Sequence, residues 1–85
     1  MNMQEAVDIV QRRMSELVPL AKWKAVGGPD DVINVTSVIR VDGREFTYRR
    51  DIQLAEIKIF GDDSCVSVGR AFLCALMRKL GENLL

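Results

Sequence analysis

The sequence predicts an α+β fold, a small single domain whose antiparallel three-stranded sheet is packed on one face by an N-terminal and a C-terminal helix. Apolar residues spaced three or four apart near both ends of the chain predict the helices. Between them, Asp42 and Gly43 form a two-residue turn flanked by alternating residues, which predicts a β-hairpin. A chain of 85 residues makes one domain and hides only about 60% of the surface that its unfolded form exposes. So thin a core favours self-association.

The first predicted helix covers residues 3–18. Asn2 is its expected N-cap, with Glu5 three residues later completing a pattern typical of a capping box. Pro19 disfavours helical backbone at Val18, so the helix is expected to end there. Its apolar face consists of Met3, Val7, Val10, Met14 and Leu17.

The hairpin is predicted over 32–52, with strands at 32–41 and 44–52. Its two-residue loop fixes the register, which sets Arg40 opposite Glu45 and Ile39 opposite Phe46. Alternation then separates an apolar face from a polar one. The apolar face holds Ile33, Val35, Ile39, Val41, Phe46, Tyr48 and Ile52. The polar face holds Asn34, Thr36, Arg40, Glu45, Thr47, Arg49 and Asp51.

Two segments compete for the role of third strand. AEIKIF, residues 55–60, alternates and is taken as the third strand, although DIQLAEI, residues 51–57, also accommodates a helical turn. LAKWKAV, residues 20–26, alternates as well and is either a short strand or an extended connection. GGPDD, residues 27–31, is a turn.

The C-terminal helix is predicted over residues 64–80, with an acidic or serine cap among residues 62–64 and Gly81 just beyond its end. Its run AFLCALM, residues 71–77, lies within an apolar arc of about 180°, which we expect the sheet, the first helix or a sister chain to cover. That arc comprises Val66, Val68, Gly69, Phe72, Leu73, Leu76, Met77 and Leu80. The opposite side is a candidate helix interface made of Arg70, Ala71, Cys74, Ala75 and Arg78.

The composition offers little catalytic chemistry. The chain has no histidine, which removes the commonest general base and the commonest metal ligand. Its two cysteines, Cys65 and Cys74, lack the CxxC spacing of zinc sites and are expected to be reduced thiols. Paired aspartates in GGPDD and FGDDS are explained by turn and cap roles without a metal. We therefore expect no catalytic, cofactor-binding or metal-binding residues and no enzymatic activity.

The sequence gives no sign of secretion or membrane insertion. Glu5 and Asp8 stand early in an N-terminus that has no long apolar run, unlike a signal or transit peptide. The apolar run at 71–77 is far shorter than the roughly 20 residues that span a bilayer. A cytoplasmic protein without a membrane partner is the expectation.

A domain without catalytic groups is expected to work by contact. The leading hypothesis is a protein-interaction module that forms a homodimer and binds or blocks a partner protein not identified by the sequence. In size alone it is analogous to the accessory and inhibitor proteins of phages and mobile elements.

Two other functions follow from particular side chains. The hairpin arginines could bind nucleic acid, since a two-stranded ribbon fits a DNA groove. The candidate partner or nucleic-acid face comprises Arg40, Arg44, Arg49, Arg50, Thr36 and Thr47. Against it stand Glu45 and Asp51 on the same face, the neutral balance of twelve basic and twelve acidic residues, and the lack of stacking aromatics there. The third hypothesis is a reactive thiol at Cys74, because flanking guanidinium groups favour the thiolate.

Overall fold

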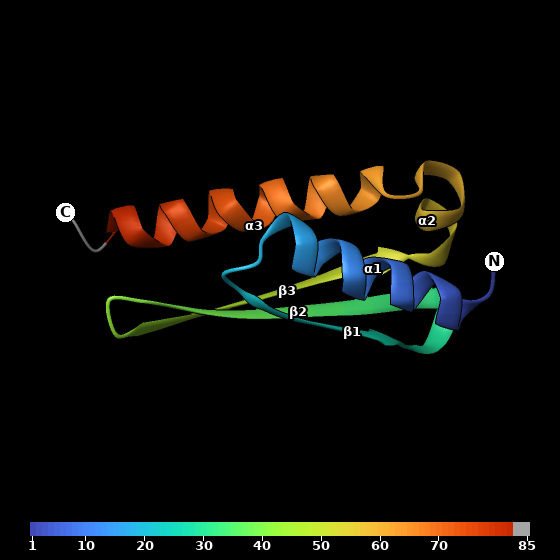
Figure 1. Ribbon diagram of the computed structural model, residues 1–85, viewed down its shortest axis with the longest axis horizontal. Helices are drawn as coiled ribbons and strands as arrows, with labels where there is room; N and C mark the ends of the chain where they lie inside the picture. Colours follow the sequence, from blue (N-terminus) through green and yellow to red (C-terminus); the bar gives the residue numbers. More distant parts are fainter. Residues whose placement is uncertain (83–85) are drawn as a thin grey trace.

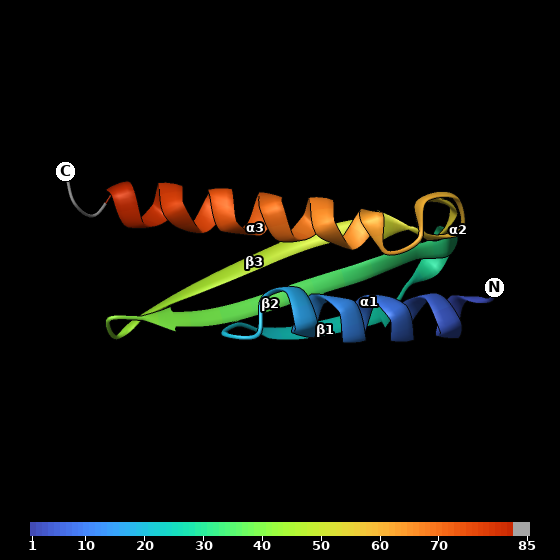
Figure 2. The ribbon, with the colours of Figure 1, turned by 45° about the horizontal axis from the view of Figure 1, so that its top comes forward.

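The computed structural model describes residues 1–82 and confirms the α+β fold (Figure 1). Its elements are α1 (Met3–Leu17), β1 (Lys22–Gly27), the 3-10 turn η1 (Pro29–Asp31), β2 (Val32–Val41), β3 (Arg44–Gln53), α2 (Leu54–Phe60) and α3 (Asp63–Glu82). The strands form one antiparallel sheet in the order β1-β2-β3. Both long helices lie on the same face of this sheet, and the other face is uncovered (Figure 2).

The predicted hairpin is present with its predicted register. Arg40 pairs with Glu45 and Ile39 with Phe46. The turn residues Asp42 and Gly43 have φ of 51° and 77°, and a two-residue hairpin turn of this type needs positive φ at both positions. The Asp-Gly pair therefore sets the register of the longest strand pairing in the sheet.

The assignment of the third strand to residues 55–60 was wrong. Lys22–Gly27 is the third strand, paired with β2 from Lys22 opposite Val38 to Gly27 opposite Ile33, and residues 54–60 form α2. In α2 the buried residues are Leu54 and Ile57, three apart, whereas Ile59, which alternation placed beside Ile57, is 72% exposed. The helix turns the chain from the end of β3 toward the face that α3 covers, and an extended segment could not make that turn while burying Leu54.

The core centres on Phe72 of α3, whose side chain is fully buried. Its ring centroid lies 5.1 Å from that of Trp23, 5.6 Å from Tyr48 and 5.8 Å from Phe46. These three aromatic residues come from β1 and β3. Between them on β2 stands the small, buried Ser37, directly opposite both Trp23 and Tyr48. Because Ser37 is small, it leaves room for the Phe72 ring to pack between these side chains and to hold α3 against the sheet.

Side-chain hydrogen bonds hold α1 against the edge of the sheet. The Gln11 side chain donates from Nε2 to the carbonyl of Trp23, at 2.7 Å, and its Oε1 accepts from the backbone N–H of Ala25, at 2.8 Å. This amide occupies backbone groups of the edge strand that would otherwise be free to pair with another strand. At the start of the helix, the Asn2 side chain accepts from the N–H of Glu5, as predicted for the N-cap.

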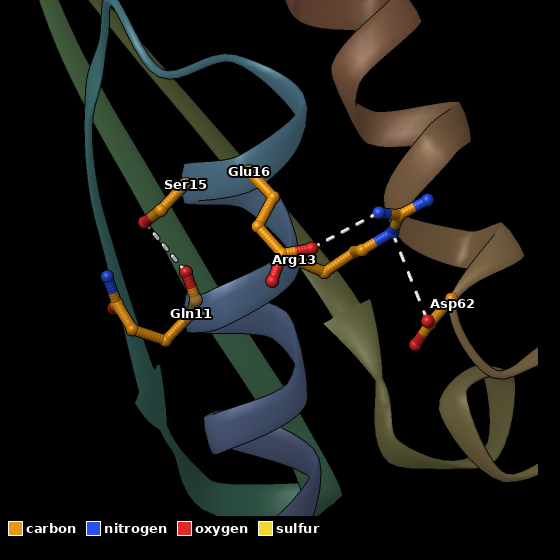
Figure 3. A network of polar contacts seen from close by, with 5 residues as sticks. All are labelled: Gln11, Arg13, Ser15, Glu16 and Asp62. Atoms are coloured by element: carbon orange, nitrogen blue, oxygen red, sulfur yellow. Dashed lines mark hydrogen bonds and ion pairs between the residues drawn. The ribbon is translucent and has the colours of Figure 1, made fainter.

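An ion pair connects α1 to the segment between α2 and α3 (Figure 3). Arg13 reaches across from α1, with its Nε 3.9 Å from a carboxylate oxygen of Asp62 and its Nη1 3.3 Å from Glu16. In the same helix, the Ser15 hydroxyl donates to the backbone carbonyl of Gln11, one turn earlier, at 2.8 Å. The guanidinium thus lies between carboxylates of two elements that are far apart in the sequence.

The observed α3, Asp63–Glu82, extends beyond both ends of the predicted helix at 64–80, and the main difference is at Gly81. Gly81 was expected just beyond the helix, but the helix continues through it to Glu82. A glycine at a helix end takes the C′ role only if its backbone turns left-handed, and Gly81 does not have positive φ. A positive φ at a helix end is found instead at Gly61, the C-cap of α2, which has φ 57° and ψ −133°.

We expect Gly61→Ala to lower the free energy of unfolding by about 1–3 kcal/mol, because a Cβ is strained in this backbone conformation. Gly81→Ala is the matched control. It should be neutral or stabilising, since alanine favours a helix by up to ~1 kcal/mol over glycine. Urea denaturation followed by circular dichroism measures the unfolding free energy of both variants. Equal effects of the two substitutions would contradict a special backbone requirement at Gly61.

Candidate interaction surfaces

The uncovered face of the sheet carries four of the six residues predicted for a partner or nucleic-acid face. Thr36 and Arg40 of β2 and Thr47 and Arg49 of β3 all lie on it, in the registers Thr36 opposite Arg49 and Arg40 opposite Glu45. Two further members of this face could not be placed from the sequence, because residues 20–26 fitted either a short strand or an extended connection. With β1 in place, Lys24 lies opposite Thr36 and Lys22 opposite Val38, and both lysines are exposed. The sequence feature that could have shown this placement is the alternation of lysines with Trp23 in that strand.

Arg44 and Arg50 belong to the other face of the sheet. The register pairs Arg44 with Val41 and Arg50 with Val35, both apolar positions on the helix-covered side. Each arginine lines a separate surface cavity where α3 passes over β3. One cavity, of about 350 Å³, is lined by Arg50, Glu56, Phe60, Asp63, Ser64, Ser67 and Val68. The other, of about 170 Å³, is lined by Val41, Arg44, Glu45, Phe46, Leu76, Lys79 and Leu80. The six residues therefore do not form one site.

The first of these cavities is polar and of mixed charge. Arg50 faces the carboxylates Glu56 and Asp63 across it, and the hydroxyl of Ser64 donates to the backbone carbonyl of Glu56 at 3.2 Å. Because acids and a base line the same cavity, it has no charge of a single sign with which to select a ligand.

The candidate helix interface on α3 lies on the solvent side. Arg70, Cys74 and Arg78 are exposed, and the two alanines, Ala71 and Ala75, are half-buried. The structure thus places these five residues as a mainly polar back of the helix. Arg70 also lines a groove with Leu17 and Val18 at the C-terminal end of α1.

Within the described chain, the sheet and α1 leave two residues of the apolar arc of α3 uncovered. Leu73 is 45% and Met77 is 70% exposed, whereas Phe72 and Leu76 are buried. The reason is the length of α1. Its C-terminal end reaches α3 beside Gly69, where Leu17, Val18, Val66, Gly69, Arg70 and Leu73 line a shallow groove. Beyond that point α3 and the hairpin continue without a second helix beside them (Figure 2).

We name the apolar α3 stripe as Val66, Leu73, Met77 and Leu80. These residues lie within about 60° of one another at 100° per residue, on the side of α3 that faces α1. Val66 and Leu80 are half-buried, so Leu73 and Met77 form its exposed centre. Leu20, in the loop that follows α1, is 86% exposed. Aliphatic side chains exposed next to one another at the end of a packed helix are typical of an interaction surface.

The two thiols differ in accessibility. Cys65 is fully buried, and burial together with the nearby Asp62 carboxylate raises the pKa of its thiol to about 11, against a smaller opposing effect of Arg13. Cys65 is therefore an inert core residue. Cys74 is exposed, with Arg70 and Arg78 one turn before and one turn after it on α3.

Residues 1–82 bring together no group of three or more His, Cys, Asp or Glu side chains that could hold a metal ion. Within the same residues, none of the helices has the length and apolar character needed to cross a membrane. A scan against protein-family models and searches of curated proteins and of solved structures find no match for this chain. Function must therefore be argued from the surfaces themselves.

Proposed function

We propose that this protein is a non-enzymatic interaction module that self-associates through the apolar α3 stripe. The observation that carries the proposal is the exposure of Leu73 and Met77 side by side, where α1 ends and α3 continues. Each large aliphatic side chain left in water forgoes roughly 1.5–3 kcal/mol of burial. In a domain this small, covering both is a substantial gain.

A second copy is an occupant that fits the stripe by symmetry. Two α3 helices packed antiparallel about a twofold axis would place the stripe of each chain on that of the other, and such an isologous contact closes without leaving a free end. Gly69, beside the stripe, is already buried against Met14 and Val18, so the contact between the two copies rests on Leu73 and Met77. The same surface is available to a partner protein, which would then compete with the dimer.

Sedimentation equilibrium from low to high micromolar concentration tests the proposal. We expect the wild-type protein to dimerise with a dissociation constant in the range of about 1–100 µM. Replacing both exposed residues, Leu73→Gln with Met77→Gln, should weaken dimerisation at least about tenfold, the result of losing ~1.4 kcal/mol or more.

The matched control replaces Ile59 and Phe60 with glutamine. These residues of α2 are 72% and 60% exposed, and they lie away from the stripe. The control should leave the dissociation constant unchanged. A wild-type protein that stays monomeric at high micromolar concentration rejects self-association, and equal weakening by both double variants rejects the stripe as its site.

A further inference from the structure

We propose that the uncovered face of the sheet binds the phosphate backbone of a nucleic-acid duplex, with Lys22, Lys24 and Arg49 as the main contacts. This face is on the side of the sheet opposite the helices (Figure 2), so the proposal stands apart from self-association through α3. It arises from the position of β1, which adds two lysines to a surface that the hairpin alone leaves weakly charged.

The register puts the three cations in two successive cross-strand rows. One row reads Lys24, Thr36, Arg49 across the sheet, and the next reads Lys22, Val38, Thr47. Strands are about 4.8 Å apart and alternate residues about 6.8 Å apart. A phosphate chain running along β2 therefore has the two lysines on one side, Arg49 and Thr47 on the other, and the Thr36 hydroxyl beneath it. Hydroxyls and cationic side chains are the usual phosphate donors in such interfaces.

The acidic residues of this face lie outside those two rows. Among the described residues, its carboxylates are Glu45, opposite Arg40 at the hairpin end, and Asp51, opposite Asn34 toward the other end. The four cations Lys22, Lys24, Arg40 and Arg49 thus exceed the acids by two on a chain that is neutral as a whole. The face therefore carries a net positive charge.

The aromatic residues decide between a duplex and a single strand. Single-strand binders stack bases on exposed aromatic side chains. Here Trp23, Phe46 and Tyr48 all point to the helix-covered side and pack around Phe72. A sheet face that offers cations and hydroxyls without a stacking platform suits the regular backbone of a duplex.

Fluorescence anisotropy with a labelled duplex of about two helical turns, as DNA and as RNA, tests the proposal at increasing salt concentrations. Three neutralised phosphates predict a slope of roughly −2.7 for log K against log salt on B-DNA. The triple variant Lys22→Gln, Lys24→Gln, Arg49→Gln should bind at least about tenfold more weakly at low salt and show a slope near zero. The double variant Glu45→Gln with Asp51→Asn should bind more tightly than the wild type.

The control triple Arg12→Gln, Arg70→Gln, Arg78→Gln removes the same charge from exposed positions on α1 and α3. It should change the affinity less than about twofold, and circular dichroism of all variants establishes that they fold. No duplex binding by the wild type at low salt overturns the proposal. Equal losses in both triples also overturn it, since they indicate attraction by net charge alone. Tighter binding to single strands, or to vesicles of anionic phospholipid, assigns the face to another polyanion and likewise overturns it.

Discussion

Replacing Phe72 with alanine should remove a large share of the protein's stability. Removing a fully buried phenylalanine costs about 3–5 kcal/mol, and a domain of this size has only ~4–13 kcal/mol of stability in total. The loss in stability is expected to be about 5 kcal/mol, at the upper end of the range for a buried phenylalanine, because three aromatic rings lose their contact with Phe72 at once. These rings are those of Trp23, Phe46 and Tyr48. Urea denaturation followed by Trp23 fluorescence and by circular dichroism measures the change.

Two substitutions separate this effect from a general sensitivity of the helices. Ile59→Ala removes an exposed side chain from α2 and should cost less than ~0.5 kcal/mol. Phe72→Leu keeps much of the volume and should recover part of the stability lost in Phe72→Ala. The central role of Phe72 is contradicted if Phe72→Ala is no more destabilising than Ile59→Ala.

The hairpin could be predicted residue by residue because its determinants are local. Asp42 and Gly43 specify the turn, the two-residue loop specifies the register, and the alternation specifies which face is apolar. No knowledge of the remaining chain is needed. The N-cap at Asn2 was predictable for the same reason, since a single side chain three residues from Glu5 satisfies it.

The third strand could not be predicted in this way, because alternation over six residues fits a strand and a short helix nearly equally. Residues 22–27 and 55–60 both alternate, and what decides between them is non-local. Trp23 can bury itself against Phe72 and donate its indole N–H to the carbonyl of Val18, at 3.0 Å. Ile59 has no comparable site, and Gly61 stops the second segment as a helix.

The candidate surfaces were missed to the extent that they depend on the third strand and on the length of α1. Lys22 and Lys24 join the uncovered face of the sheet only once β1 pairs with β2. Arg44 and Arg50 do not belong to that face, because alternation along β3 places them on the helix-covered side. A helical wheel places Leu73 and Met77 correctly beside the buried arc. It cannot show that α1 ends before reaching them.

Cys65 should make the protein less stable as the pH rises from 9 to 11. Its thiol has an ordinary pKa of 9.0, which burial and the Asp62 carboxylate raise to about 11 in the folded protein. Below pH 9 the thiol is protonated in both the folded and the unfolded state, so its contribution to stability is fully present there. Between the two pKa values the unfolded chain loses its proton while the buried thiol keeps it. The free energy of unfolding should therefore fall, by up to roughly 2–3 kcal/mol at pH 11.

Comparing two proteins isolates the contribution of Cys65 from all other effects of pH on stability. Both carry Cys74→Ser, which removes the exposed thiol, and one also carries Cys65→Ala. Urea denaturation between pH 8 and 11 should show the difference in unfolding free energy between them shrinking above pH 9, because alanine has no proton to lose. Curves that stay parallel across the whole range would place Cys65 in contact with water, against the packing that α1, α3 and the Arg13–Asp62 pair build around it.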